Sequence, residues 1–158
     1  MPADSPAILV ALDDDAGPAL RYAVDAARRA RCAVHLLHVV VPGSSPTAHA
    51  TGERLLRSAA SRAEELATGA ARVSTELAHA GPVADVIVQR ASRARQVVLQ
   101  RRDGPGHGIT ETSTCAQVAR RAACPVVLVP GPRRHEDLVV DEALAGLEII
   151  PALPGALP

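Results

Sequence analysis

The chain has 158 residues, 17 basic and 17 acidic side chains, and 47% apolar residues, which fits one globular domain and excludes wholesale disorder. All 17 basic residues are arginine, so Schiff-base catalysis and the lysine of a P-loop are excluded. Aromatic residues make up only 1%, and proteins that bind single-stranded DNA or RNA stack bases on such rings. We therefore expect no DNA or RNA partner.

Neither a membrane protein nor a secreted one is predicted. No apolar run approaches the ~18–20 residues of a membrane-spanning helix. The start at Met1–Pro6 lacks the basic and apolar regions of a secretory signal, so we expect a cytoplasmic protein. Three cysteines without a CxxC spacing argue against a disulfide framework or a zinc knuckle, and leave a redox role open for Cys32, Cys115 and Cys124.

Apolar patterning predicts strands and helices in alternation. Residues 7–12 form a continuous apolar run, typical of a strand buried on both faces, whereas 73–80 alternates as expected nearer a sheet edge. Alanine, leucine and valine recur at helical spacing after each of the first four strands. The predicted strands are 7–12, 33–41, 73–80, 96–99 and 125–129, and the predicted helices are 20–30, 56–70, 83–94 and 114–122.

The sequence also predicts a loop, a helix cap and a C-terminal extension. Residues 43–52 have the composition of a loop. Thr114 and Gln117 have the spacing of a capping box, with Thr114 as the cap of the last helix. Beyond Gly131 the chain is acidic and rich in proline, which predicts a loosely ordered extension with a short helix, if any, over 141–150.

Strands separated by helices of this length need crossover connections and therefore pair in parallel. The sequence thus predicts a three-layer α/β domain over 1–131, followed by an extension over 132–158. Ligands of such sheets bind beyond the carboxyl ends of the strands. Two segments there, Asp13–Pro18 and Arg101–Ile109, carry charges and glycines that suit a ligand, although the glycine spacing alone favours a flexible surface loop.

Five short segments, in the right order and at the right separations, resemble the universal stress protein family: Ile8–Asp13, His35–Val40, Gly81–Ile87, Val97–Leu99 and Ala123–Pro130. The resemblance implies a five-stranded parallel sheet in the order 3-2-1-4-5 with helices on both faces, the adenine nucleotide alpha hydrolase-like fold. It also implies homodimers that pair through the edge strand Val126–Val129. By the same resemblance, Asp13 contacts the base or ribose of ATP.

The family's nucleotide-binding pattern, G-2x-G-9x-G-[ST], is degenerate in this chain. Without gaps its positions fall on Leu99, Arg102, Thr112 and Ser113, so only the final serine is kept. The three aspartates after the first strand also repel a polyphosphate, by about 1 kcal/mol per close pair in water. ATP binding is therefore expected to be lost or weak. The candidate nucleotide-binding residues are Asp13, Val40, Arg101, Arg102, Gly104, Gly106, Gly108, Thr112 and Ser113.

Other chemistries fit less well. Haloacid-dehalogenase phosphatases and receiver domains share an acidic cluster after the first strand, but both resemblances imply a lysine that this chain lacks. His35 and His38 are three residues apart on a strand and so face opposite sides, and no metal site is predicted. Ser113 has no visible triad partners. Arg90 and Arg93 are interpreted as a solvated helix face rather than a nucleic-acid patch.

The sequence therefore predicts a non-enzymatic, homodimeric stress-response domain that acts by binding or signalling. One alternative is an ATP-binding member that uses Gly104, Gly106 and Gly108 in a shifted register, with slow hydrolysis or autophosphorylation. Another is a purely structural dimerisation partner.

Overall fold

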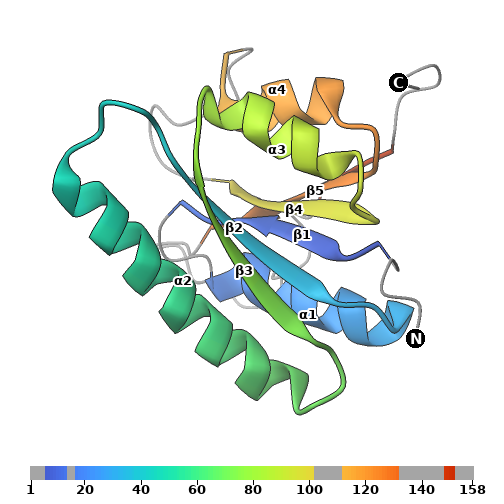
Figure 1. Cartoon of the computed structure of the whole chain (residues 1–158). Coiled ribbons are helices and arrows are strands. Elements are labelled where there is room, and N and C mark those ends of the chain that lie inside the picture. The colour runs from blue at the N-terminus through green and yellow to red at the C-terminus, as the bar shows by residue number, and fades with distance from the viewer. Residues whose placement is uncertain (1–5, 14–16, 102–111, 132–147, 152–158) are drawn as a thin grey trace, which may run out of the picture.

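The structure is a computed structural model that describes residues 6–13, 17–101, 112–131 and 148–151. The five strands and four helices predicted from the sequence are confirmed, and a sixth strand follows them (Figure 1). In chain order the elements are β1 (Ile8–Ala11), α1 (Gly17–Ala30), β2 (Val34–Val40), α2 (Pro46–Ala67), β3 (Val73–His79), α3 (Val83–Ala91), β4 (Gln96–Arg101), α4 (Thr114–Arg121), β5 (Val126–Pro130) and β6 (Glu148–Ile150).

The sheet has the order β3-β2-β1-β4-β5-β6, and its first five strands are parallel. In Figure 1, α1 and α2 cover one face and α3 and α4 cover the other. Alternate residues of β1 pack on opposite faces of the sheet: Ile8 and Val10 join the core under α1 and α2, while Leu9 joins the core under α3. Because β1 is buried on both faces, its sequence is apolar without a break. The predicted three-layer fold and strand order are thus confirmed.

The sixth strand corrects two expectations. β6 pairs antiparallel with β5, with Ile150 opposite Val126 and Ile149 opposite Val127. Residues 148–150 are therefore a strand rather than part of a helix, while 141–147 lie outside the described residues. The prediction that Val126–Val129 forms the outer edge of the sheet is wrong, because β6 occupies the hydrogen-bonding groups that an edge strand leaves unpaired.

The loop predicted over 43–52 is shorter than expected, because α2 already begins at Pro46. Ser45, with extended backbone, is the N-cap, and Pro46 follows in the first helical turn, where its missing N–H costs no hydrogen bond. At the other end Thr68 has φ 50 and Gly69 has φ 81, left-handed conformations that end the helix. The loop-like composition of residues 46–52 therefore did not reveal that Ser45 and Pro46 begin a helix.

Gly52 lets α2 lie close against β2 and β3. A Cβ at this position would come within 2.7 Å of His38 Cδ2 and 2.9 Å of Leu77 Cδ1. The His38 ring has little room to move, because its Nδ1 donates a hydrogen bond to the carbonyl of Leu12 at 2.8 Å. Gly52 thus sets the distance between this helix and the sheet.

Gly52→Ala is expected to destabilise the protein by about 1–3 kcal/mol, the usual effect of overpacking, which exceeds the ~1 kcal/mol that alanine gains over glycine in a helix. Urea unfolding followed by circular dichroism measures the change. Ser58→Ala, at an exposed position of the same helix, is the control and should raise the midpoint slightly, because alanine is the better helix former. A midpoint raised by Gly52→Ala would contradict the close contact.

Arg90 lies on a partly solvated face of α3 and also makes an ion pair with the neighbouring strand. Its Nε and terminal nitrogen donate to Glu76 at 2.9 and 2.6 Å, which ties α3 to β3. His35 Nε2 donates to the same carboxylate at 3.1 Å. The hydrogen bond from Arg90 holds the pKa of Glu76 below its usual range, against the opposing effect of burial, and His35 adds to the lowering. The Arg90 side chain is still 35% exposed and Arg93 is exposed, as the sequence interpretation expected, but the ion pair of Arg90 with Glu76 was not foreseen.

Candidate functional site

The reversal of strand order lies between β1 and β4, whose carboxyl ends are neighbours. Asp13 follows β1 after one residue, Leu12, and is exposed. The chain at this exit is held by two bonds: the Leu12 N–H donates to the carbonyl of Leu37 at 2.8 Å, and His38 Nδ1 donates to the carbonyl of Leu12. His38, on β2, therefore positions the residue that precedes Asp13.

Asp13, Arg101 and Cys115 lie at this edge close enough for the two charges to act on the thiol. Burial raises the pKa of the Cys115 thiol, the charge of Arg101 opposes that change, and the charge of Asp13 adds to it. Cys115 is thus a protonated thiol at neutral pH rather than a reactive thiolate. Burial likewise raises the pKa of Cys124 to about 11. These two thiols lack the depressed pKa that a redox role needs.

The start of α4 differs by one residue from the predicted capping box. Ser113 is the N-cap, and its Oγ accepts a hydrogen bond from the Ala116 N–H at 3.2 Å. Gln117 Nε2 donates to the carbonyl of Thr112 at 2.8 Å instead of reaching the cap's own N–H. The one serine kept from the family pattern therefore serves as a helix cap in this structure.

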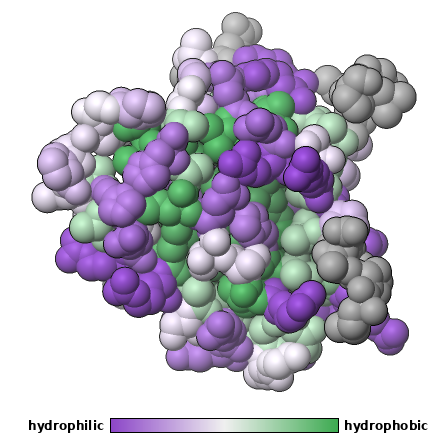
Figure 2. Space-filling view, viewed as in Figure 1, coloured by the Kyte–Doolittle hydropathy of each residue, from purple (hydrophilic) through white to green (hydrophobic). Residues whose placement is uncertain are grey.

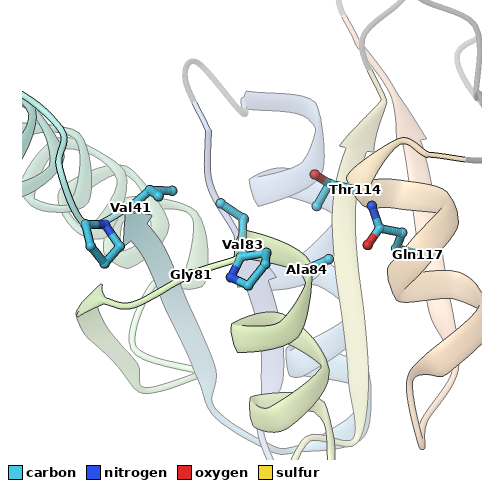
Figure 3. A pocket seen from close by; sticks show the side chains of 8 residues that line it. Val41, Gly81, Val83, Ala84, Thr114 and Gln117 are labelled. Atoms are coloured by element: carbon cyan, nitrogen blue, oxygen red, sulfur yellow. The ribbon is translucent and has the colours of Figure 1, made fainter.

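A cleft of about 520 Å³ opens at the same edge (Figure 3). Its walls come from the end of β2 and the following loop, the turn before α3, and the first turn of α4. Most of this surface is apolar, with Thr114 and Gln117 as its polar side chains. The lining residues are Val41, Pro42, Gly81, Pro82, Val83, Ala84, Thr114 and Gln117.

The amino ends of α3 and α4 both border the cleft. Helix amino ends carry partial positive charge and favour anions. No side chain caps α3 at Pro82, whereas Ser113 caps α4. A largely apolar cavity of this size with a few polar groups is the usual form of a small-molecule site. The cleft can therefore take a flat apolar group against its walls and an anionic group near the helix ends.

Among the predicted residues that the structure describes, none lines this cleft, and three of them lie next to or near residues that do. Val40 is buried at 8% exposure, and its neighbour Val41 lines the cleft. Thr112 and Ser113 precede Thr114, one of the two residues of α4 that line the cavity. Four of the nine candidates lie outside the described residues: Arg102, Gly104, Gly106 and Gly108.

Sequence reasoning missed the walls of the cleft. The segment Gly81–Ile87 carries part of the family resemblance, and its first four residues line the cavity. The cis Gly81–Pro82 peptide lies in this turn. The signal that could have predicted these walls is a turn with proline that begins a helix at the carboxyl edge of the sheet.

On the face seen in Figure 2, apolar surface is visible between polar side chains, in the region where β2 and β3 lie in front.

The model of the universal stress protein family matches residues 6–130, and the chain belongs to this family. No curated protein sequence matches the chain at a significant level. Within the described residues, no helix combines the length and the apolar character that crossing a membrane requires.

Solved structures share the fold. The universal stress protein from Archaeoglobus fulgidus in complex with dAMP is 23% identical, with a TM-score of 0.66 over 79% of this chain and 98% of that one. An Arabidopsis thaliana family member with AMP bound is 21% identical, with a TM-score of 0.58 over 87% and 98% of the two chains. A universal stress protein in complex with cAMP is 19% identical, with a TM-score of 0.60 over 80% and 98%.

Proposed function

We propose that this chain is a non-enzymatic stress-response binding domain whose ligand is an adenine nucleoside monophosphate. The supporting observation is the cleft at the carboxyl edge, where apolar walls lie beside the amino ends of α3 and α4. Similar structures in complex with dAMP, cAMP and AMP support the ligand class. The base lies against the apolar wall at Val41 and Val83, and the single phosphate lies near Thr114.

Discrimination against ATP is part of the proposal. Leu99 stands where the family pattern has its first glycine, and its side chain is 4% exposed in the core under α3. A buried leucine gives a polyphosphate no backbone cradle there. Asp13 adds a negative charge at the same edge as Arg101, which weakens the attraction that this arginine offers to extra phosphates.

The absence of catalysis is also proposed. Ser113, the hydroxyl that the family pattern keeps, accepts a hydrogen bond from the α4 backbone as a cap. Cys115 and Cys124 have raised pKa values and so are poor nucleophiles at neutral pH. Neither kind of side chain is activated for chemistry in this arrangement.

Titration calorimetry of the full chain with AMP and with ATP plus Mg²⁺ tests the proposal. AMP is expected to bind with a Kd of about 1–100 µM, and ATP at least about tenfold more weakly, a difference of about 1.4 kcal/mol. Ribose 5-phosphate is the control for binding through the phosphate alone. ATP bound more tightly than AMP would favour the shifted glycine loop, and no binding of either nucleotide would contradict the ligand class.

We propose in addition that the homodimer expected from the sequence forms only when β6 leaves β5. The edge assigned to a second copy pairs with Glu148–Ile150 of the same chain. β6 has three residues, so its displacement breaks few backbone bonds. The freed β5 would then offer unpaired groups to an antiparallel β5 of another copy.

A further inference from the structure

Two histidines that are thirty residues apart meet at the end of the sheet. His49 Nδ1 and His79 Nε2 are 2.9 Å apart, and the two rings are nearly parallel, with an interplanar angle of 16° and centroids separated by 4.8 Å. Both residues are exposed. The far nitrogen of His49, Nε2, is 3.2 Å from Glu53 Oε1. The arrangement is a Glu–His–His chain on the surface.

The fold holds these side chains in place from two rigid elements. His79 is the last residue of β3 and lies opposite Val40 in the β2–β3 ladder. His49 and Glu53 are one helical turn apart on α2, on either side of Gly52. Because Gly52 brings α2 against His38 and Leu77, the helix stands close enough to β3 for the two rings to touch.

The hydrogen bonds fix which nitrogen can act as a ligand. A carboxylate only accepts, so His49 Nε2–H donates to Glu53, and in the neutral ring Nδ1 then carries the lone pair. His79 Nε2 donates to that lone pair in the present arrangement. If the His79 proton moves to its Nδ1, both facing nitrogens carry lone pairs, and a rotation of the two exposed rings can direct these to one ion. No proton need be released overall, because His79 only changes tautomer.

We propose that His49 Nδ1 and His79 Nε2 bind one divalent late transition-metal ion such as Zn²⁺. Two nitrogens at about 2.0–2.1 Å from one ion, with a right or tetrahedral angle between them, lie about 2.9–3.4 Å apart. The 2.9 Å separation falls at the lower end of this range. Imidazole nitrogens suit Zn²⁺, Ni²⁺ and Cu²⁺, whereas Mg²⁺ and Ca²⁺ prefer oxygen ligands.

Glu53 is a positioning residue rather than a ligand. Metal-bound histidines commonly donate their outer N–H to a carboxylate, which fixes the tautomer and makes the ring a better donor. The Glu53–His49 bond has this form before any ion is present. Among the described residues, no group of three or more side chains from His, Cys, Asp and Glu gathers to hold a metal, so water or an anion would complete the coordination. Such a site exchanges its ion, unlike a closed structural zinc site.

Titration of the full chain, free of any affinity tag, with Zn²⁺ tests this site independently of nucleotide binding. Calorimetry is expected to give one equivalent, and ring-nitrogen NMR should show metal-induced shifts at His49 Nδ1 and His79 Nε2. His49→Ala and His79→Ala should each weaken binding at least about tenfold, and Glu53→Gln about 10–100-fold through the orientation of His49. His35→Ala is the matched control: His35 lies on the face of the sheet opposite to His79, and this variant should bind Zn²⁺ as the unaltered chain does.

Circular dichroism of each variant checks folding, which we expect to persist because both histidines are exposed. Zn²⁺ binding retained in the His49→Ala/His79→Ala double variant would overturn the proposal, since the ion would then lie elsewhere. Failure of the unaltered chain to bind Zn²⁺ or Ni²⁺ would overturn it as well and leave the pair as a surface hydrogen bond. Either result leaves the proposed nucleotide site untouched.

Discussion

Thr114→Trp is expected to lower the affinity for AMP at least about a hundredfold, equivalent to about 2.7 kcal/mol. Thr114 is exposed in the first turn of α4 and faces the cleft across from Val83 (Figure 3). An indole at this position fills the space proposed for the ligand. Because the side chain lies outside the core, the variant should fold normally. Calorimetry with AMP measures the loss, and thermal unfolding verifies the fold.

Thr114→Ser is the matched control, because it keeps the hydroxyl and leaves the cleft open. Its affinity for AMP should stay within about twofold of the unaltered chain. If Thr114→Trp binds AMP as tightly as this control does, the nucleotide lies outside the cleft described by Val41, Pro82 and Thr114. Such a result would contradict the proposed location without affecting membership of the family.

Removing β6 is expected to turn a monomer into a dimer. A chain that ends at Gly131 leaves β5 with an unpaired edge, and β5 consists of Val126–Pro130 with four of its five residues buried. Exposed apolar edges of this kind pair with other chains. Size-exclusion chromatography with light scattering should report the subunit mass for the full chain and twice the subunit mass for the shortened one.

Ile150→Pro in the full-length chain is a second route to the same state, because proline cannot donate a ladder hydrogen bond. Ile149→Ser is the control: Ile149 is 57% exposed, and serine keeps the backbone N–H, so the chain should remain monomeric. If the full chain is already dimeric and the shortened chain is dimeric too, the copies associate through another surface.

The residue positions at the sheet edge that the sequence predicted correctly are those set by local order along the chain. Asp13 follows β1 and Arg101 ends β4, and the pairing of these two strands brings the residues to one edge, as parallel topology requires. The helix cap moved by one residue because both Ser113 and Thr114 can cap a helix, and only backbone geometry chooses between them. Local residue types therefore fixed the region of the site but not its walls.

The sequence by itself determined the alternation of strands and helices, because apolar periodicity reflects burial on one helix face or on both faces of a strand. It also determined the strand order, through resemblance to a family of known topology. Only the tertiary structure decided that β6 closes the β5 edge, that Arg90 binds Glu76, and that His49 meets His79. Such contacts join residues far apart in the chain, and they depend on register and helix position, which periodicity leaves open.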